Sequence, residues 1–221
     1  MAFSIAIDGP AGAGKSTIAK ELAKKIEFIY VDTGAMYRAI TLYLMRKNVN
    51  LNDETQIAPV LDDINLDIEY VDGVQQVILN GENVTSLIRT QEVGFNTSTA
   101  SKNKCVREKL LNVQRKLAKT SNVIMDGRDI GTCVLKDAPI KIYLTASSAK
   151  RAQRRWLELK NKGEECDINE IEKEIIARDE QDMNREISPL KKADDAVVVD
   201  TSDMNINEVV EELFRIYNER S

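Results

Sequence analysis

The chain has 221 residues, 43% of them hydrophobic, and a formal net charge of −5. This length and hydrophobic content predict a single domain with small inserted lobes, and the negative charge argues against nucleic acid as the main partner. Histidine, the commonest general base and metal ligand, is absent from the sequence, so any chemistry must come from Lys, Arg, Asp, Ser or Thr side chains.

Five short apolar runs, each ending in an acidic or small polar residue, predict buried parallel strands. They cover residues 3–8, 28–32, 123–126, 140–144 and 196–200. Helical patterns cover residues 15–26, 35–47, 102–119, 147–162 and 206–217. This alternation predicts an α/β fold, a five-stranded parallel sheet flanked by helices, with ligands bound outside the carboxyl ends of the strands.

Two segments break the alternation. Residues 66–85 contain period-2 stretches separated by Asp72-Gly73 and Asn80-Gly81, both strong hairpin turn signals, so we expect a small antiparallel β insert. Residues 147–185 are charged and helical, with a break at 163–167, which indicates a mobile helical flap.

A phosphate-binding motif follows the first predicted strand. It consists of Gly9, Pro10, Ala11, Gly12, Ala13, Gly14, Lys15 and Ser16, matches G-x-x-x-x-G-K-[ST], and lies between a strand and a helix as the motif requires; with Thr17 it forms the predicted ATP-binding loop. Backbone N–H groups of such a loop surround the β- and γ-phosphates, Lys15 places a cation on the transferred group, and Ser16 offers a hydroxyl to Mg²⁺. Either Asp32 or Asp126, at neighbouring strand ends, could hold the water shell of that ion or instead cap a helix.

Several classes of phosphate-loop protein are disfavoured. A GTPase needs an N/T-K-x-D guanine-reading motif, which the sequence lacks, and a motor ATPase or helicase would be larger and would need a surface for nucleic acid. Small-molecule phosphorylation is therefore the favoured function. A hydrolytic ATPase, a GTPase regulator and a nucleotide-binding interaction module remain alternatives, as do UMP, AMP and shikimate kinases among the kinases.

Several arginines lie at positions suited to binding a phosphorylated acceptor. If the acceptor carries a phosphate, the site must hold two polyanions, ATP and the acceptor, next to each other, and arginines can neutralise their charge. Arg38 and Arg128 lie in loops after predicted strand ends, which favours a functional role. Further candidates lie on helices: Arg107, then Arg151, Arg154 and Arg155 on one face of the flap, and Arg178, Asp182 and Arg185 on another. Solvated salt bridges are the alternative for each helical arginine. A nucleoside monophosphate needs no general base, since its second pKa is about 6.

The motifs taken together resemble the bacterial cytidylate kinase family over essentially the whole chain. The strings that carry the resemblance are Ile7-Asp8-Gly9-Pro10, Asp32-Thr33-Gly34-Ala35-Met36-Tyr37-Arg38, Ile88-Arg89-Thr90-Gln91-Glu92-Val93, Asp126-Gly127-Arg128-Asp129-Ile130-Gly131-Thr132, and Arg178-Asp179 through Asn184-Arg185. The resemblance implies a P-loop nucleoside monophosphate kinase fold and transfer of the ATP γ-phosphate to CMP or dCMP with Mg²⁺, in pyrimidine nucleotide metabolism.

The resemblance also implies a division of roles among the site residues. The catalytic residues would be Lys15, Arg128, Arg185 and Asp129, and the acceptor phosphate would be bound by Arg38, Arg128 and Arg185. Cytosine would be recognised by Ser98, Arg107 and Asp129, the pentose hydroxyls would be bound by Arg178 and Asp182, and the CMP site would be completed by Thr33 and Tyr37. The ATP phosphates would be approached by Arg154 and Arg155. One carboxylate and one arginine suffice to read the cytosine edge, whereas uracil would turn a carbonyl towards Asp129. Some family members have Gly where this chain has Ser16.

The family likeness further divides the single domain. The core would comprise about 1–35, 100–146 and 186–221, the nucleoside monophosphate-binding lobe about 36–99, and the lid about 147–185. Cys105, Cys133 and Cys166 form no C-x-x-C pair, and the sequence contains neither a secretory signal nor an apolar run of roughly 18 residues. We therefore expect a cytoplasmic, soluble monomer whose partners are ATP, CMP and dCMP, with no nucleic-acid or membrane partner.

Overall fold

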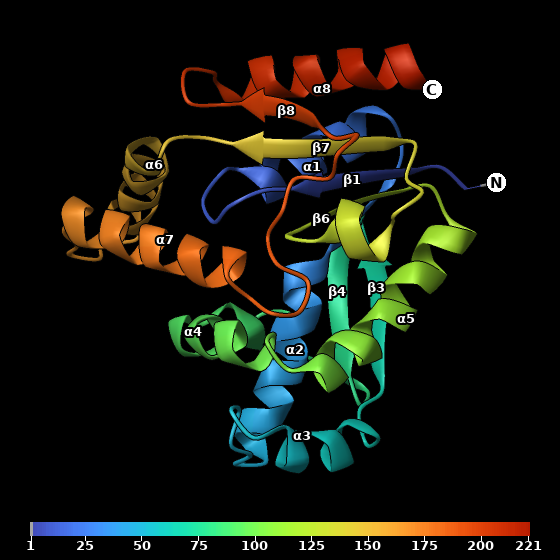
Figure 1. The fold of residues 1–221 in the computed structure, drawn as a ribbon, viewed down its shortest axis with the longest axis vertical. Coiled ribbons are helices and arrows are strands. Elements are labelled where there is room, and N and C mark those ends of the chain that lie inside the picture. The colour runs from blue at the N-terminus through green and yellow to red at the C-terminus, as the bar shows by residue number, and fades with distance from the viewer. Residues whose placement is uncertain (1) are drawn as a thin grey trace.

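A five-stranded parallel sheet forms the centre of the computed structural model, which describes residues 2–221 (Figure 1). Its strands are β1 (Ser4–Asp8), β2 (Ile29–Asp32), β6 (Val123–Gly127), β7 (Ile140–Thr145) and β8 (Val197–Asp200), in the spatial order β2-β6-β1-β7-β8. All neighbouring pairs run parallel. The predicted sheet is confirmed, and each strand lies within one residue of its predicted bounds.

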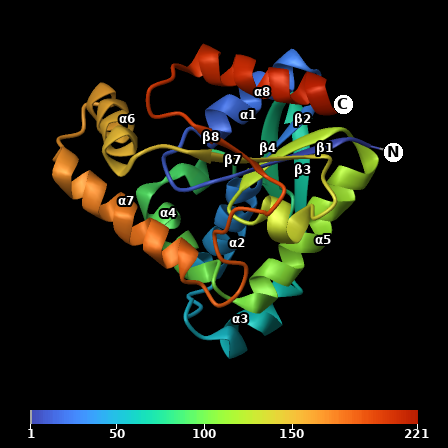
Figure 2. The same ribbon diagram turned by 45° about the horizontal axis from the view of Figure 1, so that its top comes forward.

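The central strands β6, β1 and β7 are buried on both faces, which explains why they are continuous apolar runs, whereas Val198 on the edge strand β8 is exposed. Along β1, Ile5 and Ile7 pack in the cluster that includes α1 (Lys15–Lys25) and α8 (Ile206–Arg220), whereas Ala6 belongs to the opposite cluster with α2 (Thr33–Arg46) and α5 (Lys104–Thr120). This alternation follows from the pleat, because successive side chains point to opposite faces. Figure 2 shows α1 and α8 on one side of the sheet and α2 and α5 on the other.

Helix starts are fixed by local capping. Asp32 begins α2 by accepting a hydrogen bond from the Ala35 N–H at 2.9 Å, and Asn205 begins α8 in a capping box with Glu208. The structure adds elements that the apolar periodicity did not predict: α3 (Glu54–Leu61), η1 (Leu87–Arg89), α4 (Gln91–Ala100) and η2 (Ile130–Val134). Small and polar residues dominate α4, so the apolar spacing that reveals a helix is weak there.

The predicted antiparallel insert is confirmed as a second sheet of β3 (Leu66–Val71), β4 (Val74–Leu79) and β5 (Glu82–Asn83). Its two turns have positive φ at both central residues, as Asp-Gly and Asn-Gly hairpin turns require. Gln75 ties this sheet to the edge of the main one: its Oε1 accepts from the Asp32 N–H at 2.8 Å, and its Nε2 donates to the Asp32 carbonyl at 3.3 Å. The insert therefore fixes the end of β2 that leads into α2.

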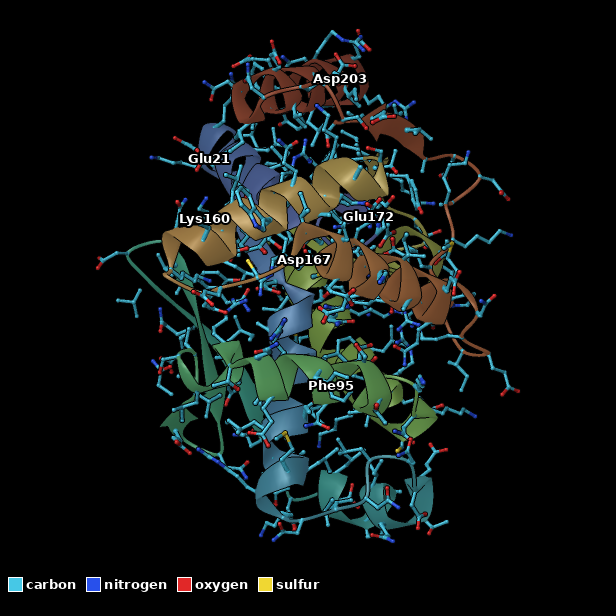
Figure 3. All side chains as sticks on the ribbon, turned by 90° about the vertical axis from the view of Figure 1, so that its left-hand side faces the viewer. Glu21, Phe95, Lys160, Asp167, Glu172 and Asp203 are labelled. Atoms are coloured by element: carbon cyan, nitrogen blue, oxygen red, sulfur yellow. The ribbon has the colours of Figure 1, made fainter. Side chains whose placement is uncertain are left out.

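Two helices, α6 (Ser148–Asn161) and α7 (Ile168–Met183), form the predicted helical segment, here called the α6–α7 hairpin. They have an apolar cluster of their own, with Ala152, Ile171 and Ile175 at its centre. The carboxyl ends of the parallel strands point towards this hairpin (Figure 1), and Figure 3 shows α6 and α7 crossing above α4. Within the described residues, no helix combines the length and apolar composition that crossing a bilayer requires.

Candidate active site

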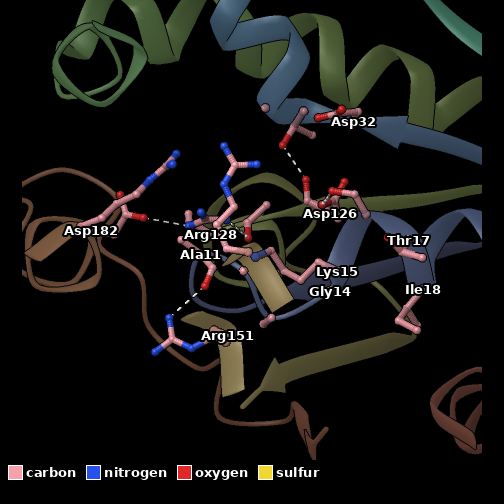
Figure 4. Close-up of a pocket in the computed structure, with 18 of the residues that line it drawn as sticks. Ala11, Gly14, Lys15, Thr17, Ile18, Asp32, Asp126, Arg128, Arg151 and Asp182 are labelled. Atoms are coloured by element: carbon pink, nitrogen blue, oxygen red, sulfur yellow. Dashed lines mark hydrogen bonds and ion pairs between the residues drawn. The ribbon is translucent and has the colours of Figure 1, made fainter. Parts of the chain in front are cut away.

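A cavity of about 1110 Å³ opens at the carboxyl ends of the parallel strands (Figure 4). It brings together most of the predicted site residues, namely Ala11, Gly12, Ala13, Gly14, Lys15, Ser16, Thr17, Asp32, Thr33, Tyr37, Arg38, Ser98, Arg107, Asp126, Arg128, Asp129, Arg154, Arg155, Arg178, Asp182 and Arg185. Gly9 and Pro10 are not among the residues that line it. One contiguous site therefore spans the phosphate loop, the ends of β2 and β6, helices α4 and α5, and the α6–α7 hairpin.

The phosphate loop joins β1 to α1 with backbone geometry that its small residues permit. A Cβ atom at Gly9 would lie 1.9 Å from the Leu144 carbonyl oxygen, and Gly14 caps α1 in the left-handed conformation with φ of 85°. Lys15 folds back over the loop, and its Nζ donates to the Pro10 carbonyl at 2.7 Å. Burial, and then the nearby charge of Arg128, lower the pKa of Lys15 well below its usual range, so an anionic ligand would stabilise its charged form.

Ser16 and Asp126 are in direct contact beside this loop. The Ser16 hydroxyl donates to one carboxylate oxygen of Asp126 at 2.8 Å, and the Tyr30 hydroxyl donates to the other at 2.9 Å. Burial, and then the charge of Asp32, raise the pKa of Asp126 to about 6. The carboxylate of Asp32 is engaged elsewhere, because it caps α2 and forms an ion pair with Arg89 at 2.8 Å.

Hydroxyl and carboxylate oxygens are the ligands that Mg²⁺ prefers, and this ion usually takes only one or two of them from the protein. Ser16 and Asp126 therefore fit the donor set. Residues 2–221 contain no cluster of three or more Asp, Glu, His or Cys side chains that would form a cage made entirely by the protein. Water and the phosphate oxygens of a nucleotide would supply the remaining ligands.

Asp129 and Arg107 form a buried pair at the opposite end of the cavity. The Arg107 guanidinium donates to the Asp129 carboxylate at 2.5 Å and to the Ser101 carbonyl at 3.1 Å, and it lies over the Tyr37 ring. Both charged side chains are buried, so each is held in one orientation. Ser98, from α4, lines the same part of the cavity.

The turn that follows Asp129 is held by a residue that the sequence analysis gave no role. Both carboxylate oxygens of Asp8, at the end of β1, accept backbone hydrogen bonds, from Ile130 at 2.8 Å and from Gly131 at 2.7 Å. These residues begin η2, the single π-helical turn after Asp129, and π turns are frequent at functional sites. Burial raises the pKa of Asp8 to about 6, although the two backbone donors oppose this rise.

A group of arginines, here called the arginine cluster, consists of Arg38, Arg128, Arg178 and Arg185 and faces the phosphate loop across the cavity. The Oδ2 atom of Asp182 lies 2.8 Å from the Nε of Arg128 (Figure 4). The Oδ1 atom of Asp182 lies 3.4 Å from the Nη2 of Arg185. The buried Nε of Arg178 and Nη2 of Arg185 have no hydrogen-bond partner. Burial, and then the charge of Arg128, lower the pKa of Arg178 to about 10. The positive charge of the arginine cluster is therefore larger than the negative charge of the carboxylate that contacts it.

Arg89, Arg154 and Arg155 also line the cavity. Arg89 lies beside Arg38 and, after burial, contributes most to lowering the pKa of Arg38. Arg154 donates to the backbone and side-chain oxygens of Thr201, at 2.6 and 3.1 Å, and Arg155 pairs with Glu158. The proximity of Arg154 and Arg155 to ATP phosphates stays a prediction.

The sequence analysis missed several residues at this site. Arg89, which lines the cavity, and Asp8 both belong to quoted strings but received no role, and Tyr30 looked like an ordinary strand residue. The cavity also includes Thr201 and the start of α8, namely Met204, Asn205, Ile206, Asn207 and Val209. Apart from the position of Thr201 after a strand end, no sequence signal marked this last group.

A phosphate loop that faces an arginine-rich wall across one cavity, at the carboxyl ends of a parallel sheet, defines a P-loop kinase. Comparison with known proteins narrows this class. A family model described as Cytidylate kinase matches residues 5–219, so the chain belongs to the cytidylate kinase family, and it is an ATP-dependent kinase.

Individual relatives agree with the family model. A cytidylate kinase from Caldicellulosiruptor saccharolyticus is 52% identical over 97% of this chain and 95% of that protein. The cytidylate kinase of Pediococcus pentosaceus is 49% identical over 99% and 97%. Among solved structures, a shikimate kinase from Acinetobacter baumannii in complex with shikimate gives a TM-score of 0.50 at 14% identity, covering 99% of this chain and 94% of that one. At that identity the structural match supports the fold alone.

Proposed function

We propose that the enzyme transfers the γ-phosphate of ATP to CMP and dCMP, yielding CDP and dCDP. The observation that carries the proposal is the excess of buried guanidinium groups that line the same cavity as the phosphate loop, including Arg178, whose Nε has no hydrogen-bond partner. Guanidinium groups that outnumber the carboxylates beside them mark an anion-binding site, because each presents several N–H donors to a phosphate. A phosphorylated acceptor would neutralise this charge.

The proposed acceptor base is cytosine. Its N4 amino group donates, whereas its N3 and O2 atoms accept, which matches a carboxylate beside a guanidinium such as Asp129 beside Arg107. Ser98 would add a further polar contact from α4. Uracil would face the Asp129 carboxylate with a carbonyl oxygen, and leaving such a buried group unmatched costs roughly 1–3 kcal/mol.

In this proposal the chain works through alignment and charge neutralisation. Lys15 and the backbone N–H groups of the loop hold the transferring phosphoryl group, while Arg38, Arg128 and Arg185 hold the acceptor phosphate in line with it. Arg178 and Asp182 would orient the pentose, and Thr33 and Tyr37 would complete the acceptor site. The acceptor phosphate is already largely deprotonated at neutral pH, so the absence of histidine is no obstacle.

For the metal, we propose Ser16 and Asp126 as the protein groups that hold Mg²⁺, in part through water. Asp126 is favoured over Asp32 because Asp32 already caps α2 and pairs with Arg89, whereas Asp126 contacts Ser16. When bound, the ion would neutralise charge on the β- and γ-phosphates. Tyr30 would keep the Asp126 carboxylate oriented whether or not the ion is present.

The division into parts follows from these roles. We propose that residues of about 1–35, 100–146 and 186–221 form the core, that about 36–99 form the acceptor lobe, and that about 147–185, which contain the α6–α7 hairpin, act as a lid. We also propose that the enzyme is a monomer, because one chain supplies both halves of the cavity.

The test is a coupled assay of ADP formation with Mg²⁺ and ATP, comparing CMP, dCMP, UMP, AMP and GMP. We expect CMP and dCMP to give the highest kcat/KM. ATP without acceptor serves as the control, since ADP released there would indicate hydrolysis. Failure to form CDP from CMP, or a higher kcat/KM with UMP or AMP, would overturn the proposal.

A further inference from the structure

Arg151 and Asp179 form a buried ion pair that joins the two helices of the α6–α7 hairpin to the phosphate loop. Their Nη1 and Oδ2 atoms lie 2.5 Å apart, and both side chains are more than nine-tenths buried. The Arg151 Nη1 also donates to the Ala11 carbonyl at 2.8 Å (Figure 4), and Asp179 Oδ1 accepts from the Ala11 N–H at 3.1 Å. Both backbone polar groups of one loop residue are therefore bound to this pair.

The contacts of the pair are with the loop. Asp179 is not among the residues that line the cavity, and Arg151, which does line it, is bonded through Nη1 to Asp179 and to the Ala11 carbonyl. The Ala11 N–H is held by Asp179 and is therefore not free to bind a phosphate. Arg151 is anchored at its other side as well, since its Nε donates to the Ala146 carbonyl at 2.9 Å. Its stem also lies against the next loop residue, because a Cβ atom at Gly12 would be 3.3 Å from the Arg151 Cβ. The loop thus rests directly on the first turn of α6.

The positions of neighbouring residues show what this contact would control. Arg154 and Arg155 lie one turn after Arg151 on α6, and Arg178 and Asp182 flank Asp179 on α7; all four line the cavity. A shift of the hairpin against the loop would move each of these groups relative to Lys15. A buried ion pair is weak evidence for stability, because desolvation offsets the attraction between the charges, so fixing a geometry is the better account of it.

We propose that Arg151 and Asp179 are positioning residues that keep the arginines of the α6–α7 hairpin in register with the phosphate loop during phosphoryl transfer. The proposal rests on the proposed function, because it assigns the pair a role in that reaction. A misplacement of about 1 Å at a transfer site can lower the rate about 10²-fold. Loss of the pair should therefore act on kcat more than on either KM.

The first experiment compares Asp179→Asn and Arg151→Lys with the parent enzyme under saturating ATP and CMP. Asparagine keeps an acceptor for the Ala11 N–H but loses the charge, and lysine keeps the charge but cannot make all the bonds of the guanidinium. We expect kcat to fall about 10- to 100-fold, with smaller changes in both KM values. Glu170→Gln is the matched control, since it removes an exposed ion pair with Lys173 on the same helix and should leave kcat unchanged.

A double variant, Arg151→Met with Asp179→Leu, separates positioning from stability. It leaves no unpaired buried charge, which would be the most destabilising outcome, although the N–H and carbonyl groups of Ala11 lose their partners. The fluorescence of Trp156, the single tryptophan, reports the integrity of the hairpin because its ring packs against the apolar cluster there. We expect parent-like fluorescence and a single cooperative unfolding transition above the assay temperature, with kcat still at least about tenfold lower.

Hydrogen exchange of the segment 9–16 gives a readout that needs no activity. We expect faster exchange in Asp179→Asn than in the parent, because the Ala11 N–H is held less tightly. If the folded variants keep kcat within about threefold of the parent, or if exchange of the loop is unchanged, the positioning role is wrong. A parent enzyme inactive towards CMP would instead overturn the proposed function, leaving the exchange measurement to decide on the contact itself.

Discussion

The two halves of the cavity differ in how far their polar groups are already satisfied. On the donor side, Lys15 donates to the Pro10 carbonyl and Ser16 donates to Asp126, so the phosphate loop is held by its own contacts. On the acceptor side, Asp182 alone contacts both Arg128 and Arg185, and the buried Nε of Arg178 lacks a hydrogen-bond partner. The donor side is preorganised, whereas the acceptor side carries unbalanced charge.

This difference between the donor and acceptor sides indicates which side should depend more on a bound ligand for its stability. Backbone dipoles and small residues can shape a phosphate cradle without any bound anion, since they add no net charge. Guanidinium groups that are buried together are costly to keep charged, since burial and then the charge of Arg128 lower the pKa of Arg178 to about 10. Substitutions in the arginine cluster should therefore affect acceptor use strongly, whereas single hydroxyl changes at the loop should have small effects.

The largest effect is expected for Arg128→Ala. This change removes a cation that faces the loop and leaves Asp182 without its 2.8 Å partner, so kcat/KM should fall about 10³-fold. Steady-state kinetics with CMP measure it, and Arg215→Ala, at an exposed arginine paired with Glu212 and Glu219 on α8, is the control. A loss below about threefold would contradict the contrast between the halves.

Asp8→Asn tests the residue that links the two halves. Burial raises the pKa of Asp8 from 3.8 to about 6, so between these pH values the folded protein binds more protons than the unfolded chain. Folding stability should therefore fall as the pH rises from about 4 to about 6, by about 3 kcal/mol in total from this group.

Urea unfolding at several pH values measures this dependence. Asparagine cannot titrate, so the slope of stability against pH should be less negative in the variant than in the parent. The comparison with the parent is needed because the pKa of Asp126 is also raised to about 6. Equal slopes in the two proteins would show that Asp8 does not titrate in this range.

Asp129→Asn sharpens the assignment of the acceptor base. An amide can turn its NH₂ group towards the carbonyl of uracil, so kcat/KM for CMP should fall by an amount equivalent to roughly 1–3 kcal/mol while the preference over UMP narrows. Kinetics with both acceptors measure the ratio, and the KM for ATP should stay near that of the parent. An unchanged ratio would remove Asp129 from base recognition.

The smallest effect is expected for Ser16→Ala. Tyr30 continues to hold Asp126 at 2.9 Å, so the carboxylate should keep its place without the Ser16 hydroxyl. We expect kcat/KM to fall less than about tenfold, with a higher Mg²⁺ concentration needed for half-maximal rate. A loss near that of Arg128→Ala would mean that the donor side is as sensitive as the acceptor side.

Much of this architecture could be predicted because its signals are local. The apolar runs placed the strands to within one residue, and Asp72-Gly73 and Asn80-Gly81 placed the hairpin turns. The phosphate loop could likewise be predicted from the spacing of its glycines, and Gly14 has the left-handed backbone conformation, with φ of 85°, that glycine adopts without strain. In each case the neighbouring residues in the chain suffice to dictate the conformation.

Choices among distant partners could not be made in this way. The sequence left Asp32 and Asp126 equivalent, and only the packing of β6 beside β2 and α1 brings Asp126 to Ser16 while Arg89 engages Asp32. Helix α4 lacks a clear apolar period, so its existence depends on packing against α2. The Ala11–Asp179 contact joins residues 168 positions apart. A side chain's type limits the bonds that it can make, but the tertiary structure decides which partner lies within reach.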